Sequence, residues 1–135
     1  MVKRVALVFG IVFLLIGILG LMQAGGREMG ADPAPHVLLG LFPVNLLHNI
    51  VHLLFGIAGL VMARTAAQAR NYLVFGGAIY LVLFVYGLIV GQESAANFVP
   101  VNTADDFLHL VLGIGMVGLG LVLTRDRSGI AGATS

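Results

Sequence analysis

Four long apolar runs restrict this chain to a small number of folds. They cover residues 5–22, 44–63, 72–90 and 107–123, and each is about 17–20 residues long. About 20 helical residues cross the roughly 30 Å hydrocarbon core of a bilayer, where an open sheet would leave backbone groups unpaired. Hydrophobic residues make up 59% of the chain and charged residues only 10%, a balance typical of proteins embedded in lipid. We therefore predict an all-α integral membrane protein with four transmembrane helices.

The chain also contains two pairs of matching segments. PVNLLHNIVHLLFGI at 43–57 matches PVNTADDFLHLVLGI at 100–114, and RVALVFG at 4–10 matches RNYLVFG at 70–76. The first pair is offset by 57 residues and the second by 66. These matches predict two tandem two-helix repeats, about 4–64 and 70–124. Because each unit contains two helices, both units enter the membrane in the same sense and form parallel repeats.

Charged residues predict the orientation in the membrane. One side of the predicted bundle carries Lys3, Arg4, Arg64, Arg70, Arg125 and Arg127. The positive-inside rule places that side, and with it both termini, in the cytoplasm. The formal net charge of +1 gives no reason to expect nucleic acid as a partner, and the absence of cysteine excludes disulfides and thiolate metal sites. We expect one four-helix domain over 1–127 and a disordered tail over 128–135.

The second and fourth predicted helices share a polar stripe. Pro43 and Pro100 stand two residues before Asn45 and Asn102, which are good N-cap residues. Positions 3, 4, 7 and 11 after each asparagine lie on one helical face. Those positions hold His48, Asn49, His52 and Gly56 in the first copy, and Asp105, Asp106, His109 and Gly113 in the second. We expect the two stripes to face each other, with glycine allowing close packing.

Ionisable residues inside membrane helices mark ligand sites, ion pathways or proton relays. The candidate metal ligands are His48, His52, Asp105, Asp106 and His109. Imidazole and carboxylate together suit a divalent transition metal. His52 and His109 occupy matching positions and are alternatively axial ligands of a haem, and His and Asp also relay protons. The remaining alternative is that the His and Asp residues only form hydrogen bonds between helices, in a structural polar network that also includes Asn45, Asn49 and Asn102.

Two further features bear on the site. The connection at 23–42 is expected outside the membrane, and its apolar end, 36–42, is expected to lie at the interface or to fold back over the bundle mouth. Tyr80 shares one helical face with Gly76 and Gly87, so its side chain is expected to turn inward. His36 lies alone in the connection, and we assign no chemistry to it.

At these motifs the chain resembles a family known in bacteria as domain of unknown function 4383. The resemblance rests on HNIVHLLFGIAGL and NTADDFLHLVLGIGM and extends over about 5–124. It implies a small four-helix protein of the bacterial inner membrane. It implies no activity and no catalytic residues, and Asp106 stands where the family pattern usually has asparagine.

These observations favour a non-enzymatic accessory or structural membrane protein with an outward-side His/Asp/Asn cluster that binds a divalent metal. The alternatives are a membrane-embedded metal-dependent hydrolase and a subunit that handles haem or protons. The expected partners are the lipid bilayer and either another membrane protein or a second copy of the chain.

Overall fold

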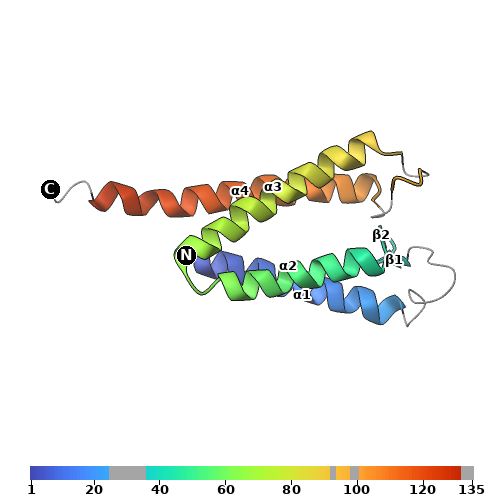
Figure 1. Cartoon of the computed structure of the whole chain (residues 1–135), viewed down its shortest axis with the longest axis horizontal. Helices are drawn as coiled ribbons and strands as arrows, with labels where there is room; N and C mark the ends of the chain where they lie inside the picture. The colour runs from blue at the N-terminus through green and yellow to red at the C-terminus, as the bar shows by residue number, and fades with distance from the viewer. Residues whose placement is uncertain (25–35, 92–93, 98–100, 132–135) are drawn as a thin grey trace.

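The computed structural model describes residues 1–24, 36–91, 94–97 and 101–131. Four helices account for most of this part: α1 (Val2–Ala24), α2 (Leu46–Met62), α3 (Ala66–Ile89) and α4 (Thr103–Ala131). They form two antiparallel hairpins, α1 with α2 and α3 with α4, as Figure 1 shows. The four predicted helices are confirmed. Helix α4 continues to Ala131, into the segment expected to be disordered, and 132–135 lie outside the described residues.

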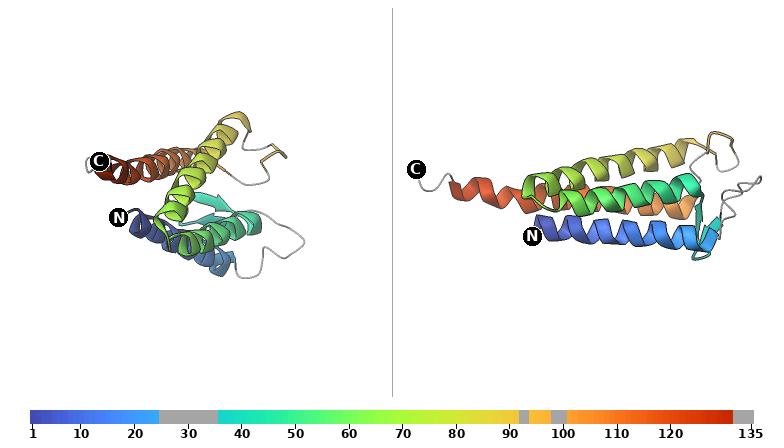
Figure 2. Two further views of the ribbon diagram at one scale, coloured as in Figure 1. Left: turned by 60° about the vertical axis from the view of Figure 1, so that its left-hand side comes forward. Right: turned by 60° about the horizontal axis from the view of Figure 1, so that its bottom comes forward.

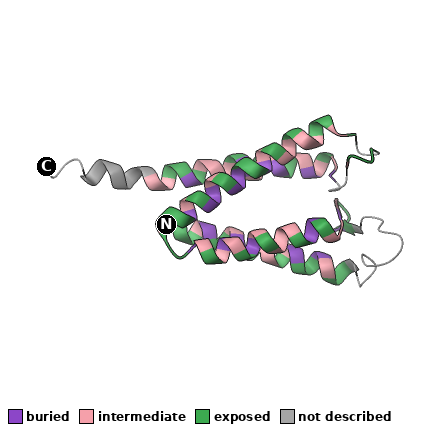
Figure 3. Cartoon of the chain, viewed as in Figure 1, coloured by how far each residue is buried: buried purple, intermediate pink, exposed green. Residues whose placement is uncertain are grey.

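Three of the helices, α1, α3 and α4, are long and apolar enough to cross a membrane within the described part of the chain. Helix α2 has only 17 residues and is shorter than a typical span. At 1.5 Å per residue it measures about 26 Å, against a hydrocarbon core of about 30 Å. Large apolar side chains remain exposed along all four helices, including Val82, Leu88 and Phe107. Figure 3 shows that exposed residues cover the outer faces of the helices. Such a surface is typical of helices in a lipid environment.

Glycine allows the two helices of each hairpin to pack closely. A Cβ added at Gly56 of α2 would lie 2.6 Å from the backbone nitrogen of Leu14 in α1. A Cβ at Gly113 of α4 would lie 2.6 Å from a side-chain methyl of Leu81 in α3. The expectation that these glycines face each other between α2 and α4 was therefore wrong. Each lies instead against the other helix of its own hairpin, because that pair has the closest backbone approach.

Aromatic and small residues fill the space between the two hairpins. Phe13, Tyr72, Tyr80 and Met116 are all buried there, together with small residues such as Ala69. The Tyr72 hydroxyl donates to the backbone oxygen of Phe55 at 3.1 Å, so one polar group of α3 is tied to α2. The inward position of Tyr80 agrees with the prediction. The two views in Figure 2 show the arrangement of the two hairpins.

A short β-hairpin precedes α2 and amends the all-α prediction. Strands β1 (His36–Leu38) and β2 (Phe42–Val44) pair antiparallel, with Leu38 opposite Phe42. Residues 39–41 connect the strands, and the backbone N–H of Leu41 donates to the oxygen of Leu38 at 3.1 Å. The central residues of this turn, Leu39 and Gly40, have positive φ values of 55° and 71°, as in a type I′ turn. Figure 1 places the hairpin at the end of the bundle where α2 and α4 begin. The expectation that 36–42 returns over the bundle mouth is thus realised as a pair of strands.

Candidate functional site

A cavity of about 100 Å³ lies at the end of the bundle that carries the β-hairpin. Four of its wall residues are ionisable: His48 and His52 from α2, and Asp105 and His109 from α4. The rest of the wall is apolar apart from Tyr80, and includes Phe13, Leu38, Phe42, Val44 and Leu112. The cavity therefore brings the polar stripes of α2 and α4 together, although the two helices have little backbone contact.

Matching asparagine caps place the first cavity residue on each helix. The Asn45 side-chain oxygen accepts the backbone N–H of His48 at 2.8 Å. The Asn102 side-chain oxygen accepts the N–H of Asp105 at 3.0 Å, and the Asp105 carboxylate accepts the N–H of Asn102 at 3.1 Å. Such reciprocal bonds satisfy N–H groups that a helix start otherwise leaves unpaired. Both N-caps agree with the sequence prediction. The caps hold His48 and Asp105 in buried positions, 6% and 3% exposed.

The β-hairpin is attached to the second of these caps. The Asn102 side-chain amide donates to the backbone oxygen of Leu41, next to the hairpin turn, at 2.8 Å. Asn102 therefore uses its oxygen to start α4 and its nitrogen to hold the hairpin. Leu38, Leu39, Phe42 and Val44 of the hairpin form one side of the cavity, so this hydrogen bond also fixes the cavity wall.

A row of four rings runs along the cavity from one hairpin to the other. The ring of His52 stacks on Phe13 at a centroid distance of 5.8 Å and an interplanar angle of 15°. Phe13 stacks on Tyr80 at 5.4 Å and 8°, and Tyr80 contacts His109 at 5.4 Å and 43°. His48 lies beside His52, at 4.6 Å between ring centroids. The row contains one ring from each of the four helices.

Four residues of the sequence-predicted cluster do not line the cavity: Asn45 and Asn102, which cap the helices, and Asp106 and Asn49. The Asp106 carboxylate occupies the space beside Gly87 of α3, and the Asn49 side chain occupies the space beside Gly20 of α1. Each polar group therefore faces the partner helix within its own hairpin. Conversely, sequence analysis missed Phe13, which is 1% exposed and lies at the centre of the ring row. An apolar residue in an apolar helix carries no local signal that separates a cavity wall from a lipid-facing surface.

The family assignment rests on one comparison. The model of the family described as a domain of unknown function, DUF4383, matches residues 3–122. The chain belongs to this family. The resemblance seen in its sequence motifs is thereby confirmed. No curated protein and no solved structure matches this DUF4383 chain. The family assigns no activity, so the chemistry of the site must be argued from its own residues.

In this DUF4383 protein the buried nitrogens bear on what the cavity can bind. The Nδ1 atoms of His52 and His109 are buried and have no hydrogen-bond partner. A buried polar atom without a partner is costly, and a water, an ion or a ligand can supply the missing partner. Among the described residues, however, no three His, Asp or Glu side chains are already arranged to hold one metal ion. Coordination of an ion would require these side chains to turn towards each other.

Proposed function

We propose that this is a non-enzymatic accessory protein of the bacterial inner membrane whose outward-side cavity binds a divalent transition metal. The observation that carries the proposal is the single cavity shared by His48, His52, Asp105 and His109. Three imidazoles and one carboxylate form a ligand set suited to zinc, copper, iron or nickel. The Nδ1 atoms of His52 and His109 are available for coordination.

A small side-chain rearrangement would complete such a site. The rings of His48 and His52 lie 4.6 Å apart, close enough for both to reach one ion at metal–nitrogen distances of about 2.0–2.1 Å. His109 and Asp105 reach the same space from α4. The cavity leaves little room for a substrate beside a metal ion, which favours binding over hydrolysis. Its volume of about 100 Å³ is below the roughly 300 Å³ of the smallest typical ligand pockets, which argues against haem.

We also propose that the four helices are two tandem parallel repeats that all cross the membrane. Matching contacts support this. A Cβ at Gly10 would meet the oxygen of Gly56 and the nitrogen of Leu60, and one at Gly77 would meet the same atoms of Gly113 and Val117. Positions in α1 and α3 then correspond at an offset of 67, and positions in α2 and α4 at 57. The offset of 67 differs by one residue from that of the segments 4–10 and 70–76.

The same offsets relate residues in the cavity and beside it. Asn49 beside Gly20 corresponds to Asp106 beside Gly87. Phe13 corresponds to Tyr80, and these two rings stack on each other. A contact between equivalent residues is expected where a twofold axis passes between two repeats. The axis would then run through the ring row, with His52 and His109 at equivalent positions on its two sides.

The orientation is the third part of the proposal. Lys3, Arg4, Arg64 and Arg70 lie at the end of the bundle opposite the cavity, at the start of α1 and around the turn between α2 and α3. The positive-inside rule makes that end cytoplasmic and the cavity end outward-facing. Both termini are then cytoplasmic.

Elemental analysis of purified protein tests metal binding. The full chain is purified in detergent without chelator, beside the double variant His52→Ala, His109→Ala. We expect close to one zinc, copper, iron or nickel ion per chain in the wild type and none in the variant. The thermal midpoint of each sample shows whether the variant remains folded. Absence of metal above background in the wild type would overturn the proposal, and the histidines would then act as interhelical hydrogen-bonding groups or as a proton relay.

A further inference from the structure

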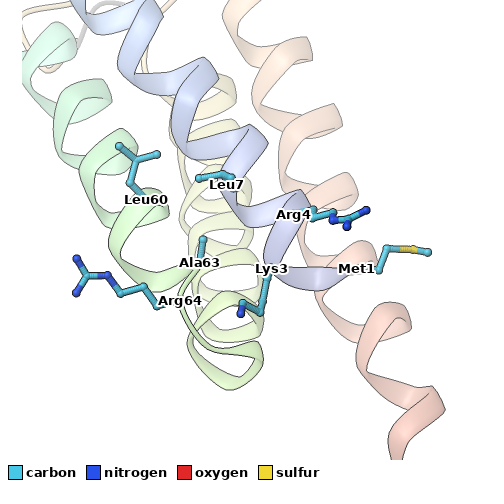
Figure 4. A pocket seen from close by; sticks show the side chains of 7 residues that line it. All are labelled: Met1, Lys3, Arg4, Leu7, Leu60, Ala63 and Arg64. Carbon is cyan, nitrogen blue, oxygen red and sulfur yellow. The ribbon is translucent and has the colours of Figure 1, made fainter.

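A second concave site lies at the opposite end of the bundle, between the start of α1 and the end of α2. It is an open groove of about 480 Å³ whose wall includes Lys3, Arg4 and Arg64 beside Leu7, Leu60 and Ala63. Figure 4 shows the three cationic side chains spread around this groove, with the two leucines above them. All three cationic side chains are exposed.

The helices arrange these residues in two layers. Lys3 and Leu7 are four residues apart on α1, and Leu60 and Arg64 are four residues apart along α2 and its end. Residues four apart lie on one helical face, about one turn from each other. Because α1 and α2 are antiparallel, both pairs place the cation at the end of the bundle and the leucine one turn towards its middle. The groove is therefore cationic at its mouth and apolar along its floor.

We propose that this groove binds the headgroup and first acyl carbons of an anionic phospholipid. The side chains of Lys3, Arg4 and Arg64 are exposed and point apart in Figure 4, so a phosphate at the mouth would draw them together. The acyl chain would continue along Leu7 and Leu60 into the bilayer. Basic pockets between transmembrane helices on the cytoplasmic side bind anionic lipid headgroups in this way. Asp105 and Asp106 lie at the start of α4, at the other end of the bundle from these cations. The inference rests on the membrane orientation proposed above.

The alternative is that these cations act only as topology determinants. Arg70 separates the two possibilities, because it lies in the first turns of α3 at the same end of the bundle but outside the groove. Its removal changes the charge of that end as much as removal of one groove cation. A bound lipid depends on the groove cations alone, whereas a general charge effect depends equally on Arg70.

The test measures the thermal midpoint of detergent-purified full-length protein during titration with phosphatidylglycerol, phosphatidylcholine or inorganic phosphate. We expect only phosphatidylglycerol to raise the midpoint, in a saturable manner. We expect Arg64→Gln to weaken the apparent affinity roughly fivefold and Lys3→Gln, Arg4→Gln, Arg64→Gln together about a hundredfold, whereas Arg70→Gln leaves it unchanged.

Three results would overturn the inference: an equal shift with phosphatidylcholine, full competition by inorganic phosphate alone, or an equal loss of affinity in Arg70→Gln. The thermal midpoint of each variant without lipid shows whether that variant is folded. If the triple variant is not folded, the loss of affinity in Arg64→Gln alone provides the test. The metal content of the triple variant is measured in parallel. A groove that fails to bind lipid in a protein that still binds metal contradicts this inference without affecting the proposed cavity function.

Discussion

Neighbouring residues at the start of α4 have different surroundings, and this decides which of them can reach a ligand. Asp105 lines the cavity, whereas the carboxylate of Asp106 packs against Gly87. Successive helical residues point about 100° apart, so only one of two adjacent carboxylates can face the cavity. On α2 the same separation divides His48, in the cavity, from Asn49, which packs against Gly20. The residues that the sequence places on one polar stripe therefore divide into two sets. One set faces the cavity, and the other faces the partner helix of the same hairpin.

Phe13 should be a major source of stability, because its ring contacts His52 on one side and Tyr80 on the other. We expect Phe13→Ala to lower the free energy of unfolding by about 3–5 kcal/mol, the usual cost of removing a buried aromatic ring. Unfolding in mixed micelles measures this value. The control is Phe107→Ala, because Phe107 is 68% exposed and its loss should cost little. Equal costs for the two variants would contradict the central position of the ring row.

At the scale of elements, each helical hairpin is held by close backbone contact at glycines. The contacts at Gly56 and Gly113 lie within the hairpins, whereas the contacts between hairpins are made mainly by aromatic rings. In lipid, small residues stabilise helix pairs by allowing extensive van der Waals contact. Substitution of these glycines should therefore weaken the packing of the two helices within one hairpin. Substitution of the aromatic residues should instead weaken the packing between the two hairpins.

Gly56→Ala tests the interface within the first hairpin. The added methyl group would lie 2.6 Å from the backbone nitrogen of Leu14, and backbone cannot move aside as a side chain can. We expect a loss of about 1–3 kcal/mol in unfolding free energy, the usual cost of overpacking. Gly118→Ala is the matched control, since a Cβ there would have no neighbour within 4 Å. A neutral Gly56→Ala would show that α1 and α2 are not in close contact in the membrane.

The elements also show how far sequence alone could reach. The apolar runs predicted the four helices, and the Pro-x-Asn pattern predicted the caps at Asn45 and Asn102. The partner of each glycine stripe could not be predicted, because a small residue indicates close packing but not which helix approaches. The β-hairpin was missed because its strands have only three residues each and its turn places Leu39 at a positive φ, which is uncommon for a leucine.

For the molecule as a whole, the two ends of the bundle differ in chemistry. One end carries a partly enclosed cavity with three histidines and an aspartate, and the other carries an open cationic groove. The proposed crossing of the membrane by all four helices would place both ends at membrane interfaces. The proposed orientation assigns the cavity to the outside and the groove to the cytoplasm, so the two sites would meet ligands from different compartments.

Single cysteines test this orientation directly, because the chain has none of its own. Ser94, between α3 and α4, and Ala67, in the first turn of α3, are both exposed. We expect Ser94→Cys to react with a membrane-impermeant maleimide in intact cells and Ala67→Cys to react only after permeabilisation. Reaction of both cysteines from the same side would show that α3 does not cross the membrane. The reverse pattern would show that the proposed topology is inverted.

The most direct test of the central claim is calorimetric titration of Zn²⁺ into the nanodisc-embedded protein, comparing Asp105→Asn with Asp106→Asn. The two substitutions are identical in charge and adjacent in sequence, but only Asp105 lines the cavity. We predict one Zn²⁺ per chain in the wild type and in Asp106→Asn, and at least about tenfold weaker binding in Asp105→Asn. No saturable binding in the wild type, or equal weakening in the two variants, would contradict a metal site formed by this cavity.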